Sequence, residues 1–262
     1  MRIVCSFFLL VTLLWCGCVE RVNAQEQEKL RYRRELYSGL KGEIQLSGAF
    51  ALYPIVVRWA EEFRKMHPDV RIDISAGGAG KGITDALAKV VDLGMVSRDV
   101  YPQELGKGAF PIAVVKDAVV PTINVNNPLI KEILAIGLKR DAAVRMWAKG
   151  EVKTWGDVLG TASKIPVHVY TRSDACGAAE TFADWLDIKQ EDLEGTAVFG
   201  DPGVTSVVQR DKVGIGFNNI AYTYDITSKK PYNNIAVMPM DMNGNGKIDP
   251  EENIYATSTE LN

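Results

Sequence analysis

Residues 170–181 read Tyr170-Thr171-Arg172-Ser173-Asp174-Ala175-Cys176-Gly177-Ala178-Ala179-Glu180-Thr181. The run before them, 165–170, alternates apolar and polar residues, and the run after them, 182–186, carries apolar residues at helical spacing. This pattern predicts a strand, a turn of small residues and the start of a helix. The first N–H groups of a helix have no intrahelical partner and lie at the positive end of its dipole. The junction is therefore a candidate anion site.

Two charged side chains of this stretch suit an anion. Arg172 can hold an oxyanion with two parallel N–H groups, and Asp174 can orient the guanidinium or accept a proton from the ligand. The alternative is that Asp174 only caps the helix and Arg172 is a solvated surface charge. Short motifs often match by chance, so the stretch alone leaves both interpretations open.

Composition limits the kinds of partner. The chain has 262 residues, 47% of them hydrophobic and 24% charged, which is enough for one large domain or two small lobes. The formal net charge is -3, and no basic run is interleaved with aromatic residues. These features argue against nucleic acid as a partner. An anion must therefore be bound by a local site.

The first 24 residues have the organisation of a secretory signal peptide. A charged start at Arg2 precedes the apolar run 3–18, and small residues precede Gln25. We expect export to the periplasm and cleavage after Ala24. In the alternative, Cys18 becomes the lipid-modified first residue of a lipoprotein. If the segment is removed, Cys176 is the one cysteine left, and no internal disulfide can form.

Strands and helices alternate after a charged tether at 25–42. We predict strands at 43–47, 69–74, 93–96, 109–115, 118–125, 165–170, 213–217 and 235–240. Helices are predicted at 52–66, through Ile83, Leu87 and Val90 after the glycine-rich loop 75–82, at 154–159 and within 129–150; 204–209 is either helix or strand. Such alternation predicts an α/β protein with a parallel sheet, whose ligands lie beyond the carboxyl ends of the strands.

Five segments in order resemble the phosphate-binding subunits of bacterial phosphate ABC transporters. They are Leu46-Ser47-Gly48-Ala49-Phe50-Ala51-Leu52-Tyr53-Pro54 with the helix after it, Gly77-Gly78-Ala79-Gly80-Lys81-Gly82-Ile83, Asp92-Leu93-Gly94-Met95-Val96-Ser97-Arg98, Thr171 to Ala178, and Gly214-Ile215-Gly216-Phe217. The resemblance covers nearly all of residues 43–240. It implies a type II periplasmic binding-protein fold, in which two α/β lobes joined by hinge strands close on a dehydrated oxyanion.

The resemblance implies lobe one at 43–118, lobe two at 119–238, and a return to lobe one at 239–262. Few residues are left for that return, so we expect the first lobe to be incomplete at its C-terminal end, with uncovered apolar surface near Leu46, Ile72 and Leu93. The ligand-binding residues that it implies are Ser47, Gly48, Ala49, Phe50, Ala79, Gly80, Ser97, Arg98, Arg172, Asp174, Cys176, Gly177 and Ala178.

Several of these positions depart from the family pattern. Phe50 replaces a hydroxyl, Ala79 a serine, Cys176 and Ala178 a serine and a threonine, and Arg98 an acidic residue. A hydroxyl donated to a buried oxyanion contributes about 1.5–3 kcal/mol. We therefore expect phosphate affinity to be lower than in a site that keeps these hydroxyls.

The resulting interpretation is a monomeric, non-enzymatic solute-binding protein that takes a small oxyanion, phosphate first, and passes it to the membrane subunits of an ABC permease. The alternative is a periplasmic or surface sensor or interaction protein that keeps the fold but binds weakly or binds another ligand. A third interpretation is catalysis, with Cys176 as the nucleophile and His168 on the preceding strand as its neighbour. The chain has only two histidines and no carboxylate pair suited to acid–base work, so we expect no enzyme.

A separate motif begins at Asp241 and predicts a structural calcium ion. Counted from Asp241, glycine falls at the sixth place, isoleucine at the eighth and glutamate at the twelfth, as in a calcium-binding loop. The alternative is an Asn/Gly-rich turn. A strand rather than a helix precedes the loop, which favours a structural clip over a signalling hand. The predicted ligands are Asp241, Asn243, Asn245, the Lys247 carbonyl, Asp249 and Glu252.

Overall fold

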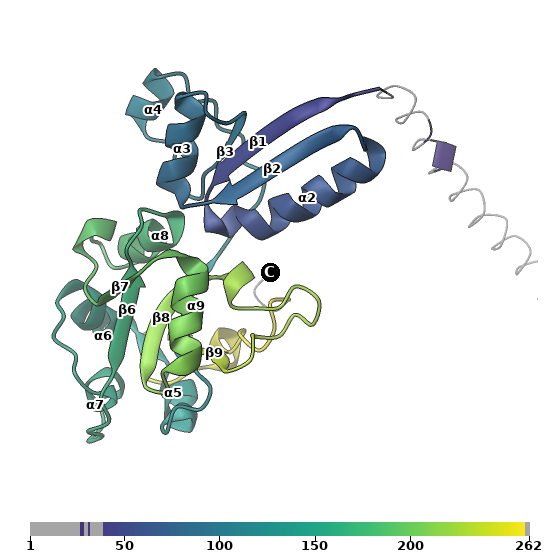
Figure 1. Ribbon diagram of the computed structural model, residues 1–262. Coiled ribbons are helices and arrows are strands. Elements are labelled where there is room, and N and C mark those ends of the chain that lie inside the picture. Colours follow the sequence, from purple (N-terminus) through teal and green to yellow (C-terminus); the bar gives the residue numbers. More distant parts are fainter. Residues whose placement is uncertain (1–26, 29–30, 32–38, 260–262) are drawn as a thin grey trace, which may run out of the picture. The chain divides into compact units, whose positions relative to one another are not determined.

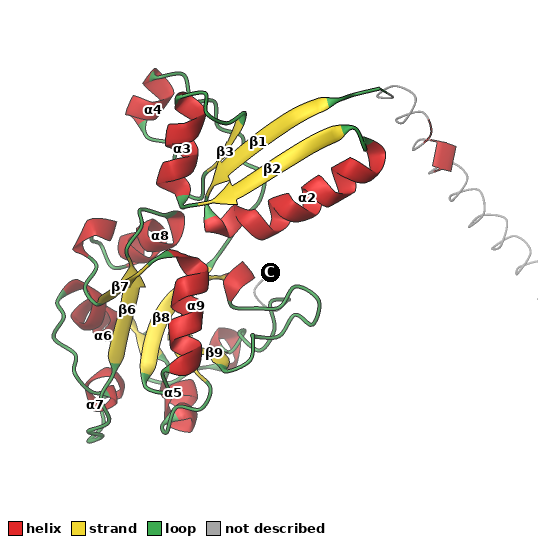
Figure 2. Cartoon of the chain, in the orientation of Figure 1, coloured by secondary structure: helices red, strands yellow, loops and turns green. Residues whose placement is uncertain are grey.

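The computed structural model describes residues 27–28, 31 and 39–259 (Figure 1). The signal peptide, Cys18 and most of the tether lie outside these described residues. Figure 2 shows helices and strands alternating through the described chain. No helix among the described residues combines the length and the apolar character that a membrane crossing requires.

The first described strands form a small sheet. Over residues 39–118, the elements are β1 (Gly42–Gly48), η1 (Phe50–Leu52), α2 (Tyr53–Met66), β2 (Val70–Ala76), α3 (Ala79–Leu87), β3 (Leu93–Met95) and α4 (Pro102–Gly106). Within these residues the sheet order is β2-β1-β3, and β1 runs parallel to β3 with Leu46 opposite Leu93. The predicted strands at 43–47, 69–74 and 93–96 and the two helices between them are confirmed.

The chain separates into two compact units. One contains the described residues up to Ile44 together with Trp59–Ile72, and the other contains Gln45–Arg58 and the chain from Asp73 onward. In the first unit, the ring centroids of Phe63 and His67 lie 4.5 Å apart, and the Arg64 guanidinium donates to the carbonyl of Ile72. These contacts fix the end of α2 against the start of β2.

The second unit contains a larger, mixed sheet. Among the described residues its strands are β4 (Val119–Asn124), β6 (His168–Arg172), β7 (Thr196–Val198), β8 (Gly214–Asn219) and β9 (Ile235–Val237), in the order β7-β6-β8-β4-β9. β6 is parallel to β7 and β8, whereas β4 is antiparallel to β8 and β9. Within this larger sheet, the expectation of parallel strands is therefore met only around β6, where the candidate site lies.

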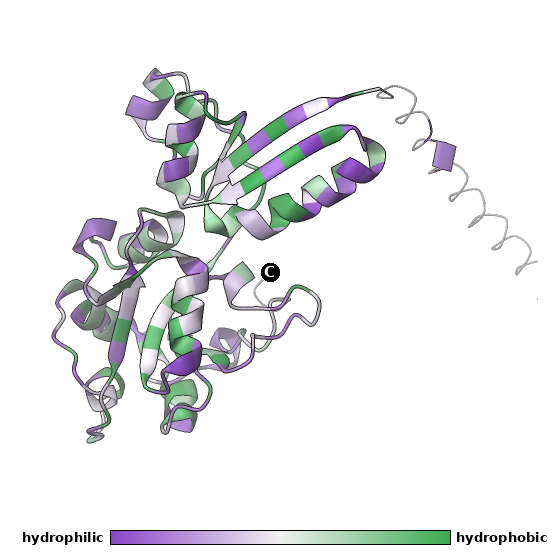
Figure 3. Cartoon of the chain, in the orientation of Figure 1, coloured by the Kyte–Doolittle hydropathy of each residue, from purple (hydrophilic) through white to green (hydrophobic). Residues whose placement is uncertain are grey.

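Helices cover this sheet. They are α5 (Ile130–Ile136), α6 (Arg140–Ala143), the π-helical η2 (Val144–Ala148), α7 (Trp155–Leu159), α8 (Gly177–Trp185) and α9 (Gly200–Arg210), with 3-10 turns η3 (Gln190–Asp192), η4 (Ile220–Tyr222) and η5 (Pro250–Glu252). Figure 3 shows apolar bands along β8 and α9. The Phe182 and Phe217 rings stack with centroids 4.4 Å apart, and Trp147 meets Phe182 edge-on at 4.9 Å. This aromatic core anchors α8 to β8.

One predicted strand is wrong. Residues 109–115 pair with no strand among the described residues, and Phe110 and Ile112 are 86% and 71% exposed. An apolar run alone cannot form a strand without a neighbour to accept its backbone hydrogen bonds.

The ambiguous run at 204–209 is helical and belongs to α9. The strand predicted at 235–240 ends at Val237, because Pro239 lacks an N–H group for the ladder.

The chain after Pro239 packs on elements assigned to lobe two. β10 (Met240–Asp241) pairs in parallel with β5 (Leu138–Lys139), and the hydroxyl of Tyr224 donates to the carbonyl of Tyr255 at 2.9 Å. This differs from the expected return to lobe one at 239–262. Of the surface expected to be uncovered, Leu93 is 55% exposed, but Ile72 is buried.

The close packing of α3 on β1 and β3 gives a stability prediction. A Cβ added to Gly82 would lie 2.9 Å from both the Gly48 Cα and the Ser47 oxygen, whereas a Cβ on Gly106 would meet nothing within 4 Å. Gly82→Ala should therefore destabilise the protein by about 1–3 kcal/mol through overpacking. Gly106→Ala, the control, should leave stability unchanged or slightly raised. Urea unfolding measures both, and equal stability of the two variants would contradict this packing.

Candidate functional site

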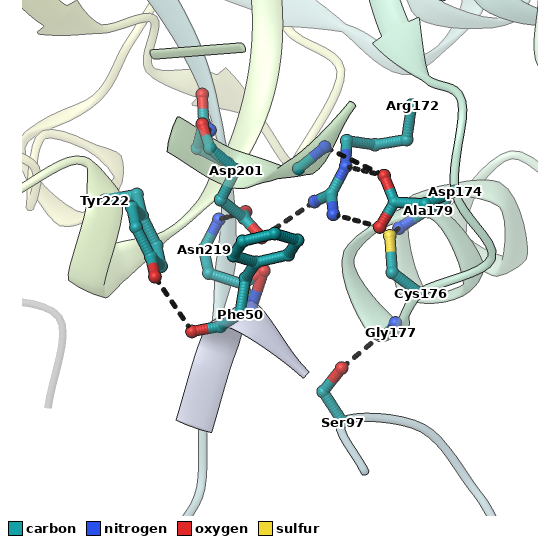
Figure 4. Close-up of polar contacts among 12 residues, drawn as sticks. Phe50, Ser97, Arg172, Asp174, Cys176, Gly177, Ala179, Asp201, Asn219 and Tyr222 are labelled. Carbon is teal, nitrogen blue, oxygen red and sulfur yellow. Dashed lines mark hydrogen bonds and ion pairs between the residues drawn. The ribbon is translucent and has the colours of Figure 1, made fainter. Parts of the chain in front are cut away.

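The candidate site is organised around Arg172, the last residue of β6 (Figure 4). Its side chain is fully buried. Nε and Nη2 donate to the two oxygens of Asp174 at 2.9 and 2.7 Å, and Nη1 donates to Asp201 Oδ2 at 2.8 Å. The interpretation of Arg172 as a solvated surface charge is therefore wrong.

Asp201 is a residue of the candidate site that the sequence analysis did not single out. It lies in the first turn of α9 and is 2% exposed. Its Oδ1 accepts the backbone N–H of Asn219 at 3.0 Å, and its backbone carbonyl accepts from Asn218 Nδ2 at 2.9 Å. The available signal was Pro202 directly after Asp201, because proline and acidic residues are typical of a helix start. The sequence analysis began this element at residue 204, so Asp201 and Pro202 lay before its predicted start.

The buried charges do not balance. One guanidinium faces the carboxylates of Asp174 and Asp201, which leaves a formal surplus of one negative charge among these groups. Burial alone would lower the pKa of Arg172, but its hydrogen bonds to the Asp174 carboxylate and the charge of Asp201 outweigh that effect and raise the pKa above its ordinary value. Arg172 is therefore permanently cationic at any physiological pH.

Asp174 occupies a position typical of a bound anion. Besides the guanidinium fork, its Oδ1 accepts the backbone N–H of Gly200, the first residue of α9, at 2.9 Å. Its Oδ2 also lies near Gly78, the N-cap of α3, where an added Cβ would be 3.2 Å away. Asp174 does not cap α8, because the N-cap of that helix is Cys176. The carboxylate thus satisfies an N-terminal N–H of α9 with an anion of the chain itself.

The start of α8 is also internally bonded. Cys176 Sγ accepts the N–H of Ala179 at 3.4 Å, the N–H of Cys176 donates to Gln190 Oε1 at 3.2 Å, and the N–H of Gly177 donates to Ser97 Oγ at 3.2 Å. The predicted residues Ser97, Cys176 and Gly177 are therefore brought together. Ala178, which the sequence analysis placed beside them, is buried in the same turn.

Two of the other predicted residues bond to their own neighbours instead. Ser47, fully buried, donates to Asp85 at 2.6 Å, and the Lys81 ammonium pairs with the same carboxylate. Arg98 holds both oxygens of Glu104 at 3.0 and 2.8 Å, and its guanidinium carbon lies 4.1 Å from the Tyr101 ring centroid. Their donor groups are thus engaged away from Arg172.

Small and apolar residues make up the rest of the predicted set. Phe50 packs against Gly200, where an added Cβ would lie 3.0 Å from the ring, and it meets Phe199 edge-on at 5.6 Å. The Phe50 carbonyl accepts from the Tyr222 hydroxyl at 3.1 Å. Ala49 and Ala79 are buried, the Gly48 carbonyl accepts the N–H groups of Gly77 and Gly78, and Gly80 lies near Ala175. The surroundings of the ion network are therefore largely apolar.

The thiol of Cys176 is not activated. Burial raises its pKa to about 12, and the nearby Arg172 only partly opposes that shift. His168 bonds through Nδ1 to Asp211 at 2.6 Å on the exposed start of β6. A thiol with this pKa is almost wholly protonated at neutral pH and is a poor nucleophile.

We therefore predict that Cys176 reacts slowly with iodoacetamide at pH 7.5, at least about 100-fold more slowly than free cysteine, because a pKa near 12 leaves little thiolate. Labelling is followed by mass spectrometry of the folded protein, and the urea-unfolded protein serves as the control with an accessible thiol. Fast modification of the folded chain would contradict the buried, neutral thiol.

Comparison with known proteins assigns this chain to a family. A family model described as a PBP superfamily domain matches residues 35–262. The phosphate-binding protein PstS of Pseudomonas aeruginosa is 29% identical over 223 residues, which cover 79% of this chain and 67% of that protein. PstS of Staphylococcus haemolyticus is 28% identical over 190 residues, 68% of this chain and 56% of that protein. The chain therefore spans about two thirds of these relatives or less.

Solved structures share the fold. A structure described as a phosphate ABC transporter substrate-binding protein with bound phosphate, from Clostridium perfringens, aligns with a TM-score of 0.63 and 24% identity over 76% of both chains. An ABC-type phosphate transport receptor from Vibrio cholerae aligns at 0.54 and 20% over 80% of both. The effector binding domain of QuiR in complex with shikimate aligns at 0.52 and 17% over 78% of this chain and 82% of that one.

The relatives are named as binding proteins, and the expectation of a non-enzymatic protein is confirmed. The sequence match over residues 35–262 and the structural likeness agree with the resemblance seen in five segments of the sequence. The chain belongs to the PBP superfamily, and its fold is the type II α/β fold of periplasmic binding proteins.

Proposed function

We propose that this chain is an extracytoplasmic solute-binding protein that holds a small oxyanion, phosphate first, and delivers it to the membrane subunits of an ABC transporter. The observation that carries the proposal is the buried guanidinium of Arg172 at the carboxyl end of β6, beside the starts of α8 and α9. Ligands of α/β sheets bind at this edge. The phosphate-binding relatives support the choice of ligand class.

Arg172 keeps donors for a ligand. A guanidinium has five N–H groups, and three of them bond to Asp174 and Asp201, which leaves one on each Nη nitrogen. Each of these N–H groups can donate to an oxygen of a tetrahedral oxyanion. In an apolar, buried setting each such charge-assisted hydrogen bond contributes about 1.5–3 kcal/mol.

The surplus negative charge favours a ligand that carries a proton. An oxyanion next to Asp174 or Asp201 is repelled unless it donates a hydrogen bond to one of these carboxylates. Hydrogen phosphate has such a proton at neutral pH, and sulfate does not. The site should therefore prefer phosphate to sulfate.

A second function is favoured by another observation. The hydroxyl of Ser47, the guanidinium of Arg98 and the N–H groups of Cys176 and Gly177 are all bonded within the protein. An incoming ligand gains little from groups that are already satisfied. A sensor or interaction protein that keeps the fold and binds oxyanions weakly is the alternative that this arrangement supports.

Isothermal titration calorimetry with phosphate, sulfate and molybdate distinguishes the two functions. We expect heat with phosphate and none with sulfate or molybdate, because both of these anions lack a proton at neutral pH. Heat with none of the three would reject the transport proposal in favour of the alternative.

Arg172→Ala should abolish phosphate binding, because it removes the remaining N–H pair and leaves two buried carboxylates without a cation. Arg140→Ala is the matched control, since Arg140 is a half-exposed arginine paired with Asp187, and it should bind as the parent does. Circular dichroism verifies that both variants are folded. A folded Arg172→Ala protein with unchanged affinity would reject this site.

A gain of affinity tests the same site while the buried charges stay in place. Cys176→Ser combined with Ala178→Thr adds two hydroxyls to the first turns of α8, and the affinity for phosphate should rise by about 10-fold or more per hydroxyl. Cys176→Ala is the control, because it removes the thiol without adding a hydroxyl. Weaker phosphate binding in the double variant would show that the site is shaped for another ligand.

A further inference from the structure

The loop from Asp241 to Glu252 contains two buried carboxylates whose charge has no cation. Asp241 is 5% and Glu252 is 9% exposed. Within the described part of the chain, neither forms an ion pair with a basic side chain; the ion pair of this loop joins Lys247 to Asp249 at 2.9 Å. The Lys139 ammonium lies near Gly246 but pairs with neither carboxylate. Buried charges are normally paired or coordinate a metal ion.

The oxygens of the loop have capacity left for a cation. One backbone N–H reaches each of Asp241 Oδ2, Asn243 Oδ1, Asn245 Oδ1 and Glu252 Oε2, at 2.8, 2.9, 3.1 and 3.1 Å. Each such oxygen has two lone pairs, so one remains on each atom. The Lys247 carbonyl adds a fifth oxygen. With water, these groups reach the six to eight oxygens that calcium takes.

The chemistry of the donors selects the metal. Among the described residues, no three histidine, cysteine or acidic side chains lie together in a way that would hold a metal by themselves. The loop can therefore bind a cation only by adding amide and carbonyl oxygens, which suit hard cations and not zinc. Asp249, the ninth residue, is turned toward Lys247 and the amides of Asn243 and Asn245, and the ninth place often acts through water.

We propose that residues 241–252 bind one calcium ion. Gly246, at the sixth place, has a φ of +86°, a left-handed conformation that lets the chain turn sharply there. Calcium is favoured over magnesium, because the donors are many and in part neutral, whereas magnesium requires six ligands in strict octahedral geometry.

The ion would hold the last described segment against α5 and β5. Asp241 lies in β10 opposite Lys139 of β5, and the N–H of Ile248 donates to the Ala135 carbonyl at the end of α5, at 3.2 Å. The Ile248 side chain fills the space over Gly137, where an added Cβ would lie 2.8 Å from its Cγ1. The loop is thus attached at both its first and its eighth residue, and calcium between them fixes residues 240–259 to α5 and β5.

The full chain, freed of metal by a chelator, is titrated with calcium and with terbium. Calcium at about 100 times its Kd should raise the melting temperature by roughly 5–10 °C, and magnesium at the same concentration should raise it much less. Terbium should give sensitised luminescence that calcium displaces. Calcium should also slow proteolysis within residues 240–259.

Glu252→Gln is compared with Glu251→Gln. Both remove one carboxylate from adjacent residues, but Glu251 is exposed at the eleventh place and is not a predicted ligand. Glu252→Gln should weaken calcium binding at least about 10-fold and Glu251→Gln less than about threefold. Equal effects of the two variants, an equal response to magnesium, or no shift in melting and no luminescence would overturn the calcium site.

Discussion

The buried ion network of Arg172, Asp174 and Asp201 is the constraint on which the site depends. It joins the end of β6 to the first turn of α9, and through Asn219 it reaches the end of β8. Moving such ions out of water costs several kcal/mol each, and only good geometry with further hydrogen bonds offsets that cost. The network has that geometry: a bidentate fork on Asp174, and backbone N–H groups on both carboxylates. These three elements must therefore keep one arrangement.

The polar neighbours extend this constraint into the sheet. Asn218 donates to the backbone of Asp201 and accepts from Thr122 of β4 at 2.9 Å. The pKa of Asp117 is raised by burial of its carboxyl and by the charge of Asp201, although hydrogen bonds from Ala118 and Asn219 oppose the shift. The negative charge of the network thus helps to raise the pKa of Asp117, an acid outside the network. β8 thus contributes Asn218 and Asn219 to this polar network and Phe217 to the aromatic core, where its ring stacks on Phe182 of α8.

Much of the fold was predictable from the sequence, because its elements are specified locally. β1, α2, β6 and α8 follow from period-two and helical spacing, and α7 follows from Thr154 and Asp157, which cap it reciprocally. The failure at 109–115 has a tertiary cause: whether an extended apolar run has a partner strand depends on distant chain. The mixed direction of the larger sheet has the same cause. Neither the missing partner strand nor the strand direction can be predicted from the spacing of residues within the segments themselves.

The candidate site was predictable in its centre and not in its partners. Arg172 and Asp174 stand two residues apart at a strand end, so their contact is local. Asp201 is 29 residues from Arg172, and only the pairing of β6 with β7 and the turn into α9 bring it there. Ser47 and Arg98 were expected to face a ligand. Ser47 instead donates to Asp85, which is 38 residues away in α3, and Arg98 pairs with Glu104, which is six residues away in α4. Sequence spacing does not show whether such a residue bonds to an acidic side chain or to a ligand.

The residues that replace hydroxyls at the predicted ligand positions and the ion network of Arg172, Asp174 and Asp201 have a physical consequence in common. Where hydroxyls surround an oxyanion, the protein leaves donors that only the ligand satisfies. Here Phe50, Ala79, Cys176 and Ala178 donate nothing of that kind, and an apolar environment strengthens the attraction between Arg172 and its carboxylates. Asp174 then fills, from within the chain, the place of an anion at the start of α9. In the proposed function, a ligand competes with this carboxylate or uses it as an acceptor, so a proton on the ligand favours its binding.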